Sequence, residues 1–533
     1  MHVLIDNPVL LLFVVIGVGA ALGSVRVRGV ALGPAAALFV GLAVSAYDDR
    51  LANTPAIVSQ IGLALFIYTV GLASGPSFLA EVRRGGVKVL VGVTVLLALF
   101  TVALAGVGQL FGFDAGERAG LFAGSLTNTP ALSAALHTLG TRMAAGEVTD
   151  PVVGYSLAYP FGVLMMLFAA QWSLRRRRNS SGDEAVVSAP ATRSATSATF
   201  RVARADLPAL GELRHWQGSH LAFSRYEQAG RVELATTDVR LLPGDLCVVI
   251  GIADEVDRFI EWIGERSTRH LALDRTTFDF RRISVSNRAL AGVHLRDLDL
   301  EGRFGATVTR VRRGDTDVVT DHDFVLRLGD RLRVVGPASR LPEVAAILGD
   351  SDRGLGEVDA MGFAIGMSIG LLIGLISIPL PGGGSVELGV GGGPLIAGIV
   401  LGTFSRTGGI TWQVPHAANL TLRQLGILIF LASIGIRSGA TFADAAGTAV
   451  GAQLAAAALI VTVLLALASV LLMRLLGSAP ESAAGQIAGI ETQPAVHAYA
   501  AERTEGDERV DAGYALVLPL AMILKLILVQ LLI

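Results

Sequence analysis

The residues best suited to bind a ligand lie where a hydrophobic segment is interrupted before a proline. Within "GSLTNTPALSAAL", Thr127, Asn128 and Thr129 stand directly before Pro130. Proline removes one backbone donor and breaks the helical hydrogen-bond pattern. Hydroxyl and amide side chains there can satisfy the freed backbone groups or bind a ligand. The interruption is therefore either a capped kink or part of a polar binding site.

A second segment repeats this arrangement of polar residues before a proline, with different residues. Glu491, Thr492 and Gln493 precede Pro494, and "AGIETQPA" aligns with "AGSLTNTPA" when one residue is deleted. Paired interruptions at matching positions of two halves favour a transport site between them. Half-helix N-termini at such a site would direct partial positive charge at an anionic substrate. We expect Glu491 to be either a buried partner of a proton or cation, or a hydrated cytoplasmic carboxylate.

Another repeated block places polar residues inside hydrophobic sequence. "QIGLALFIYTVGLASGPSF" aligns without gaps with "QLGILIFLASIGIRSGATF". A glutamine at the start of a membrane span is costly unless it forms hydrogen bonds, so each one lines a cavity or links neighbouring helices. The shared glycines favour close packing of helices. The aligned candidate pairs are Gln60 with Gln424 and Ser74 with Ser438.

Three further candidates differ in how the repeat treats them. Arg437 occurs only in the second copy, where it could bind a substrate carboxylate or extend its charged end towards lipid headgroups. Tyr155 and Tyr514 form a pair, because "GYSLAYP" aligns with "GYALVLP". Either their hydroxyls line the cavity or their rings anchor the spans at the membrane interface.

Composition places these motifs in a membrane protein. Charged residues make up 17% of the 533 residues and the mean hydropathy is +0.59, whereas soluble domains contain roughly 25% charged residues. Runs such as 8–25 and 89–111 approach or exceed the ~20 residues that cross a bilayer. The first run lacks the basic start of a cleaved signal peptide, so we expect it to be a retained span. The single cysteine, Cys247, excludes an internal disulfide.

Charge divides the chain into hydrophobic outer parts and a polar middle. We predict one membrane repeat at 1–174 and a second at 355–533. Residues 175–199 begin with four arginines, contain few apolar residues and predict a flexible linker. Two small α+β domains are predicted at 200–270 and 271–350, because "LLPGDLCVVIG" aligns with "LRLGDRLRVVG" within segments of alternating polarity.

Lysine and arginine in the short loops orient the predicted spans. They place the N-terminus outside and residues 175–353 in the cytoplasm. The loop charges fit only if 118–140 enters and leaves on the outer side as a re-entrant hairpin. Each repeat then has five spans plus one re-entrant hairpin, and the odd number of spans inverts the second copy. The predicted fold class is a multi-pass α-helical membrane protein with two inverted repeats and the two small domains between them.

The same blocks carry a family resemblance. "QIGLALFIYTVGLASGPSF", its second copy, "GSLTNTPAL" and "GIETQPAV" resemble the aspartate:alanine exchanger family of bacterial secondary transporters. "PGDLCVVIG" and "LGDRLRVVG" resemble the TrkA C-terminal (RCK-C) domain, which occurs in pairs between the membrane halves of that family. The Ala, Arg and Val bias looks more like the succinate-exporter branch. The resemblance implies a homodimer in the cytoplasmic membrane that exchanges or exports small carboxylates such as aspartate, alanine, glutamate or succinate.

Other function classes fit the sequence less well. It contains no enzyme signature, Walker lysine or Cys/His cluster, so we expect no enzyme activity, cofactor or bound metal. No basic stripe points to nucleic acid. The expected partners are a small carboxylate or amino acid, membrane lipid, a second copy of the chain and a small regulatory ligand on the RCK-C-like domains. The main alternative is an RCK-regulated ion channel or ion transporter, although no Thr-Val-Gly-Tyr-Gly filter is present.

Overall fold

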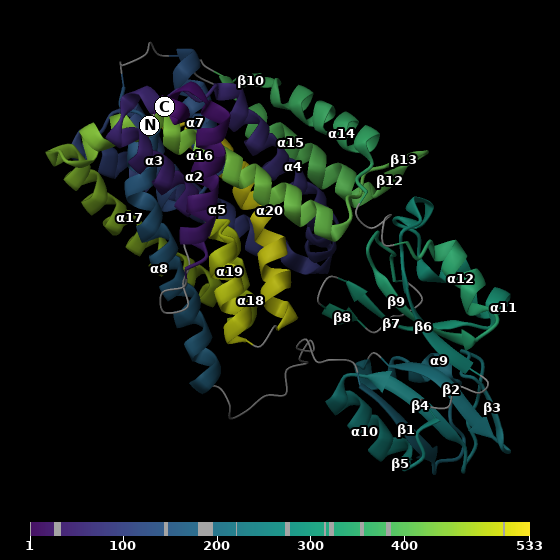
Figure 1. Cartoon of the computed structure of the whole chain (residues 1–533). Coiled ribbons are helices and arrows are strands. Elements are labelled where there is room, and N and C mark those ends of the chain that lie inside the picture. Colours follow the sequence, from purple (N-terminus) through teal and green to yellow (C-terminus); the bar gives the residue numbers. More distant parts are fainter. Residues whose placement is uncertain are drawn as a thin grey trace. The chain divides into compact units, whose positions relative to one another are not determined.

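The computed structural model describes residues 2–25, 33–142, 148–179, 196–219, 221–271, 278–313, 316–318, 324–351, 357–379, 385–504 and 507–533. The chain divides into two compact units, both drawn in Figure 1. The helical unit comprises Met1–Ala189, Met361–Phe404 and Asn419–Ile533. The sheet unit comprises Pro190–Ala360 and Ser405–Ala418.

The first part of the helical unit consists almost entirely of helices. Its elements are α1 (His2–Asp6), α2 (Pro8–Gly23), α3 (Ala35–Tyr47), η1 (Asp49–Leu51), α4 (Ala56–Glu81), η2 (Val82–Gly86), α5 (Val87–Phe111), α6 (Ala115–Ser125), α7 (Thr129–Arg142) and α8 (Pro151–Asn179). Local sequence sets several of these ends. Gly112 adopts φ 72° after α5, and the side chains of Asp114 and Glu117 form a reciprocal capping box at the start of α6.

The second part repeats much of this order. Its elements are α14 (Ala360–Gly374), β10 (Ser377–Pro379), β11 (Ser385–Glu387), α15 (Gly389–Phe404), α16 (His416–Ala446), α17 (Ala449–Leu475), α18 (Pro480–Glu491), α19 (Pro494–Arg503) and α20 (Glu508–Gln530). Within the described residues, six helices are long and apolar enough to cross a membrane: α4, α5, α8, α16, α17 and α20. Shorter apolar helices are α2, α3, α14 and α15.

Glycines bring the repeated blocks of α4 and α16 into backbone contact. A Cβ added at Gly62 would lie 2.8 Å from the carbonyl oxygen of Gly426 and 2.7 Å from the amide nitrogen of Phe430. A Cβ at Gly426 would lie 2.7 Å from both the Gly62 carbonyl oxygen and the Phe66 amide nitrogen. Aligned residues of the two copies therefore meet reciprocally, at a separation that only glycine allows.

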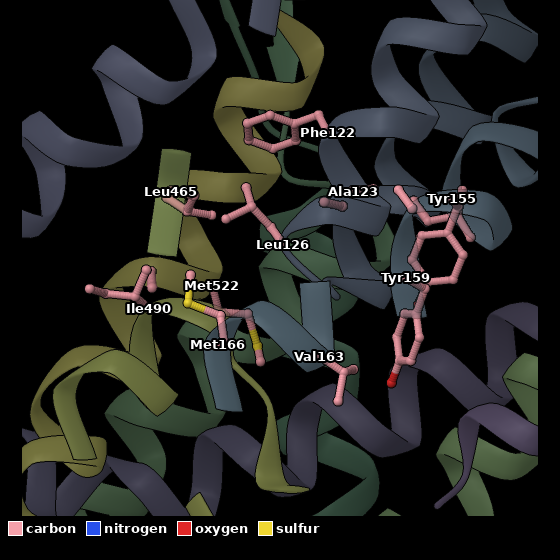
Figure 2. Close-up of a cluster of buried hydrophobic side chains, with 14 of the residues drawn as sticks. Phe122, Ala123, Leu126, Tyr155, Tyr159, Val163, Met166, Leu465, Ile490 and Met522 are labelled. Atoms are coloured by element: carbon pink, nitrogen blue, oxygen red, sulfur yellow. The ribbon is translucent and has the colours of Figure 1, made fainter. Parts of the chain in front are cut away.

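The core of the helical unit lies around the broken helices. Figure 2 shows Phe122 and Leu126 of the α6 segment, Met166 of α8, Ile490 of α18 and Met522 of α20 in one cluster. All five side chains are at most 3% exposed. Since a close-packed interior resists displacement of any one side chain, this cluster fixes the broken helices against α8 and α20.

The sheet unit contains two antiparallel sheets. The first has the order β3-β2-β4-β1-β5 and the second β6-β9-β7-β8. Each sheet packs against its own hydrophobic core. The strands are β1 (Thr196–Val202), β2 (Ala222–Gln228), β3 (Arg231–Leu234), β4 (Leu246–Gly251), β5 (Gly264–Arg266), β6 (Phe278–Ser284), β7 (Thr307–Arg313), β8 (Thr316–Val318) and β9 (Arg331–Pro337). The α-helices are α9 (Leu210–Leu213), α10 (Ala253–Ile263), α11 (Leu300–Phe304) and α12 (Leu341–Leu348), and a short hairpin joins β12 (Arg406–Thr407) to β13 (Ile410–Thr411).

The two aligned Gly-Asp pairs of the sheet unit form the same turn. Gly244 before β4 has φ 98° and Gly329 before β9 has φ 94°, a region that favours glycine. Asp245 accepts a hydrogen bond from the amide of Leu242, and Asp330 accepts one from the amide of Arg327, each 2.8 Å long. The tandem sequence pattern thus corresponds to a repeated turn that leads into a buried strand.

The predicted linker at 175–199 overlaps regular structure at both ends. Helix α8 continues to Asn179 and strand β1 begins at Thr196. The remainder, 180–195, lies outside the described residues.

Candidate functional site

Each interrupted segment forms a hairpin of two helices with a non-helical tip. We call residues 126–130, where α6 gives way to α7, the first tip, and residues 491–494, where α18 gives way to α19, the second tip. The first tip includes the start of α7, and the second tip includes the end of α18 and the start of α19. Thr127 and Thr492 adopt left-handed backbone with φ 44° and 57°. A β-branched residue rarely takes this conformation. The two tips therefore use the same uncommon backbone bend at aligned threonines.

The hydrogen bonds that end α6 and α18 also match. The amide of Thr127 donates to the carbonyl of Gly124, as the amide of Thr492 does to that of Gly489, each at 3.0 Å. The following amides, of Asn128 and Gln493, donate to Ala123 and Ala488 at 2.8 and 3.2 Å. These bonds satisfy carbonyls that a helix end leaves without partners.

Polar side chains then start the second helix of each hairpin. The side-chain oxygen of Asn128 accepts a hydrogen bond from the amide of Ala131 at 2.8 Å. The side-chain oxygen of Gln493 accepts one from the amide of Ala495 at 3.4 Å. Amide side chains thus cap the starts of α7 and α19, which accounts for the Asn and Gln before each proline.

The two tips bind each other. The Thr127 hydroxyl donates to the Glu491 carbonyl at 3.1 Å, and the Asn128 amide donates to the Thr492 hydroxyl at 3.0 Å. Both bonds are buried, where a polar atom without a partner is costly. The structure therefore brings together two tips that are more than 350 residues apart in the chain.

Two tyrosines of α8 extend this network. The hydroxyls of Thr129 and Tyr155 are 3.1 Å apart, and the Gln493 amide donates to the Tyr159 hydroxyl at 2.8 Å. The rings of the two tyrosines lie side by side in Figure 2, with centroids 5.5 Å apart. Helix α8 thus contacts both tips through successive turns.

A buried lysine completes the junction. The ammonium of Lys525 on α20 donates to the Leu126 carbonyl at 3.1 Å and to the Thr492 hydroxyl at 3.2 Å. Lys525 and Glu491 are both 0% exposed and interact electrostatically. The described contacts include no direct ion pair between them, and neither carboxylate oxygen of Glu491 has a hydrogen-bond partner there.

A cavity of about 490 Å³ opens beside the tips. Its volume is within the range of small-molecule sites, ~300–1,000 Å³. Arg423 of α16 lines it and forms no ion pair with any residue that the structure describes. The polar and tip residues in its lining are Thr127, Thr129, Pro130, Tyr159, Arg423, Gln424, Thr492, Gln493, Pro494, Tyr499 and Glu502.

Seven of the sequence candidates line this cavity, and three more lie behind it. Asn128, Glu491 and Tyr155 are at most 1% exposed and do not line the cavity. They contact the lining residues instead. The candidates in the lining are Thr127, Thr129, Pro130, Thr492, Gln493, Pro494 and Gln424.

Five candidates lie outside the lining. Gln60 is exposed and Ser74 is half-buried. Ser438 is buried and interacts with Asp150, which is also within electrostatic range of the exposed Arg437. The ring of Tyr514 lies against His497, with centroids 4.5 Å apart. The repeat therefore pairs residues whose surroundings differ.

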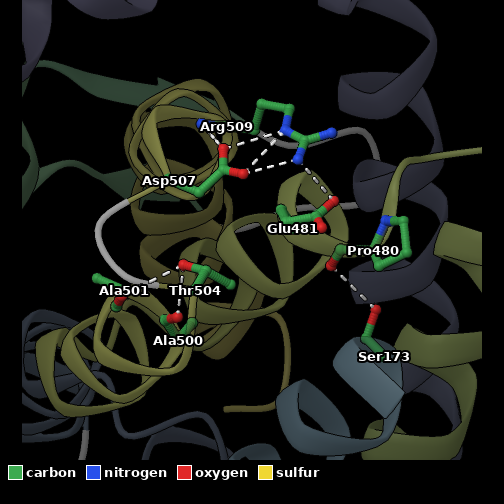
Figure 3. A network of polar contacts seen from close by, with 8 residues as sticks. All are labelled: Ser173, Pro480, Glu481, Ala500, Ala501, Thr504, Asp507 and Arg509. Atoms are coloured by element: carbon green, nitrogen blue, oxygen red, sulfur yellow. Dashed lines mark hydrogen bonds and ion pairs between the residues drawn. The ribbon is translucent and has the colours of Figure 1, made fainter. Parts of the chain in front are cut away.

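The base of the second hairpin, at the start of α18 and the end of α19, is held by charged side chains (Figure 3). Arg509 binds Asp507 at 2.6 Å and Glu481 at 3.2 Å. The Thr504 hydroxyl donates to the Ala500 carbonyl at 2.9 Å, and the Ser173 hydroxyl of α8 donates to the Pro480 carbonyl at 3.4 Å. These contacts fix the second hairpin at the end opposite its tip.

Sequence reasoning missed Lys525, Arg423 and Tyr159. Lys525 had a signal, because it is the one charged residue in "YALVLPLAMILKLILVQLLI", and a charge inside a membrane span is a functional candidate. Tyr159 lies within the quoted repeat "GYSLAYP" without a tyrosine at the matching position of "GYALVLP". Arg423 lies directly before the aligned block that begins at Gln424, and nothing in the pattern separates it from an interfacial arginine.

Comparison with known proteins gives matches over nearly the whole chain. A family model described as "Predicted Permease Membrane Region" matches residues 11–174 and 362–533, and a TrkA-C domain model matches 280–349. Proteins named "Uncharacterized transporter" match from Geobacter sulfurreducens, with 42% identity over 100% of this chain and 99% of that one, and from Symbiobacterium thermophilum, with 40% identity over 99% and 98%. The solved GsuK RCK domain is 9% identical, covers 30% of this chain and 65% of its own, and has a TM-score of 0.16. A match this weak does not establish a shared fold.

Proposed function

Because this chain belongs to the aspartate:alanine exchanger family and is a multi-pass transporter with a TrkA-C domain, we propose that it exchanges or exports small carboxylates by alternating access. The observation that carries the proposal is the cavity bordered by both tips and by Arg423. Its polar groups come from helices that are far apart in the sequence, as expected where opposing halves of a transporter meet.

The chemistry of the cavity suits a small anion. A guanidinium presents several donors in a fixed plane that matches a carboxylate, and Arg423 has no ion pair with the described residues. Pro130 and Pro494 place the starts of α7 and α19 in the lining, where helix N-termini contribute partial positive charge. Hydroxyls and amides of Thr129, Tyr159 and Gln493 would orient the remaining polar groups of the substrate.

We also propose that the two halves are inverted repeats with five spans and one re-entrant hairpin each. The reciprocal contacts of Gly62 with Phe430 and of Gly426 with Phe66 fit helices that run antiparallel. The antiparallel course of these aligned spans supports opposite orientations of the two copies in the membrane. In this scheme the N-terminus is outside, residues 175–353 are cytoplasmic, and the protein is a homodimer in the inner membrane.

For the sheet unit we propose a regulatory role in which a small ligand biases the alternating-access equilibrium. A ligand shifts such an equilibrium only through different affinities for the two states. The match to a TrkA-C domain at 280–349 supports this role. Retention of full transport and of its regulation after deletion of residues 200–350 would contradict it.

Counterflow in proteoliposomes tests the transport proposal. Vesicles loaded with unlabelled aspartate, alanine, glutamate or succinate should accumulate the matching labelled compound, with and without a proton gradient. Absence of counterflow for every carboxylate and amino acid tested, by protein that is folded in the vesicles, would contradict the proposal.

Two arginines of α16 provide a matched pair of variants. Arg423→Ala should raise the KM for carboxylates by roughly 10- to 100-fold, because a hydrogen bond to a charged group contributes about 1.5–3 kcal/mol. Arg437→Ala removes the same charge from the same helix outside the cavity lining and should leave the KM unchanged. Equal effects of the two substitutions would place substrate recognition elsewhere.

A further inference from the structure

The surroundings of the Lys525 ammonium have the composition of a cation site. Within the part of the chain that the structure describes, its two hydrogen-bond partners are oxygens, the Leu126 carbonyl at 3.1 Å and the Thr492 hydroxyl at 3.2 Å. The Glu491 carboxylate is within electrostatic range and lacks a hydrogen-bond partner among the described residues. Carbonyl, hydroxyl and carboxylate oxygens are the ligands that hard cations such as Na⁺ take in proteins.

The ammonium also lies where two helix dipoles direct negative charge. Leu126 follows the last residue of α6, and Thr492 follows the last residue of α18. The C-terminus of a helix carries about half an elementary negative charge. In transporters with broken helices, such half-helix C-termini and unwound carbonyls coordinate the coupling cation.

The hydrogen bonds of Thr492 show that the Lys525 ammonium is an integral part of the junction between the two tips. Its hydroxyl donates to the Glu491 carbonyl at 2.6 Å and accepts from both Asn128 and Lys525. A hydroxyl has one proton and two lone pairs, so this set uses all of them. Removal of the ammonium would leave a lone pair of the Thr492 hydroxyl, the Leu126 carbonyl oxygen and the buried Glu491 carboxylate without this cation.

We propose that Lys525 is a tethered cation that fills an ion site between the two tips, so that the junction forms without a dissolved metal cation. In this proposal the side chain supplies the positive charge where a cation-coupled transporter would bind Na⁺. Consequently transport should not depend on sodium, and loss of the ammonium should create a vacant site that accepts a small free cation.

Thermal unfolding of the purified full-length protein tests the site without any transport assay. Lys525→Ala removes the charge and leaves space, whereas Lys525→Met removes the charge and fills the space. Unfolding is measured in choline chloride and in equal concentrations of lithium, sodium, potassium and methylammonium chloride. We expect the Tm of Lys525→Ala to rise by roughly 1–3 °C in at least one small cation, in a saturable manner, because a ligand that binds only the folded state stabilises it.

The controls assign that cation to the junction. Lys525→Met and wild-type protein should show no such rise, and Glu491→Gln added to Lys525→Ala should abolish it. An unchanged Tm of Lys525→Ala in all salts, or an equal rise in Lys525→Met, would overturn the inference. A sodium-dependent Tm of the wild type would overturn the inference as well, whether or not Lys525→Ala yields folded protein.

Counterflow provides a second arm that rests on the proposed transport function. Wild-type flux should be equal in sodium and in choline, and Lys525→Ala flux should fall at least about 10-fold in choline and recover in the cation that raises its Tm. Sodium-dependent wild-type flux would contradict the tethered cation. Wild-type protein without carboxylate flux, combined with the cation-dependent Tm of Lys525→Ala, would refute the proposed substrate class and leave the ion site standing.

Discussion

The two hairpin tips share a backbone and differ in charge. Thr127 and Thr492 make the same left-handed bend, and the same pair of hydrogen bonds closes α6 and α18. At the residue before this bend, however, the first tip has Leu126 and the second has Glu491. The two copies thus share a conformation and differ in the charge that they carry at this position.

The difference extends to the partners of the two aligned carbonyls. The Leu126 carbonyl accepts a hydrogen bond from the Lys525 ammonium, whereas the Glu491 carbonyl accepts bonds from the hydroxyls of Thr127 and Thr492. Among the described residues, every charged side chain that lines the cavity or contacts the tips comes from the second half: Arg423, Glu491, Glu502 and Lys525. The first half supplies hydroxyls, an amide and aromatic rings. The geometry is symmetric, and the electrostatics are not.

Removal of one charge from this junction should have the largest effect on stability. Glu491→Leu leaves the fully buried Lys525 without a nearby opposite charge and should lower the free energy of unfolding by about 3 kcal/mol, the scale for leaving a buried charge uncompensated. Glu491→Leu combined with Lys525→Met should recover most of that loss, because apolar residues of similar volume replace such pairs at little cost. Thermal unfolding in detergent measures both. A double variant no more stable than Glu491→Leu would show that the two charges are not coupled.

Substitution of a glycine beside the Glu491 carboxylate should have an intermediate effect on stability. A Cβ added at Gly162 of α8 would lie 2.7 Å from the Ser125 carbonyl oxygen and 2.9 Å from the Glu491 carboxylate. The aligned position of α20 is Ala521. Gly162→Ala should therefore cost about 1–3 kcal/mol through overpacking. Ala521→Gly should cost about 1 kcal/mol through helix propensity, and the order of the two Tm values is the measurement. The reverse order would mean that the Glu491 carboxylate and the Ser125 carbonyl can both move aside freely.

The sequence predicted the tips because their signals are local. Proline preceded by hydroxyl and amide residues marks a break, and alignment of the two copies locates both breaks. The tips' mutual hydrogen bonds and the lining by Thr129 and Gln493 agree with the prediction that the two breaks form one polar region. That these residues bind substrate stays a prediction.

The remaining site residues depend on position along a helix, which the motif alone does not fix. The repeat distinguishes Arg437, because the other copy lacks it, yet Arg423 is the arginine that lines the cavity. Fourteen residues of α-helix correspond to about 21 Å, so two arginines on one helix lie at very different depths. Gln60 and Gln424 are aligned, and only Gln424 lines the cavity. Sequence identity between repeats does not imply identical surroundings when the neighbouring helices differ.

The two bend threonines should differ in the cost of losing their hydroxyls. The Thr127 hydroxyl donates to the Glu491 carbonyl, whereas the Thr492 hydroxyl bonds to Glu491, Asn128 and Lys525. Valine has nearly the same shape as threonine, so the strain of the bend is common to both substitutions. Thr127→Val should cost about 1 kcal/mol and Thr492→Val about 2–3 kcal/mol, because buried partners lose their bonds. Unfolding measurements on both variants that gave equal costs would contradict the unequal roles of the tips.

The smallest effect is expected from the aligned glutamines, and it falls on binding rather than stability. Gln424 lines the cavity and Gln60 is exposed outside it, so neither substitution to alanine disturbs the core. One neutral hydrogen bond contributes about 0.5–1.5 kcal/mol, so Gln424→Ala should raise the KM for the proposed carboxylate substrate roughly 2- to 10-fold. Gln60→Ala should leave the KM unchanged, and counterflow at graded substrate concentrations measures both. A KM increase in Gln60→Ala that equals that of Gln424→Ala would mean that the repeat is functionally symmetric at this position, because each glutamine would then contact substrate in its own half of the transport cycle.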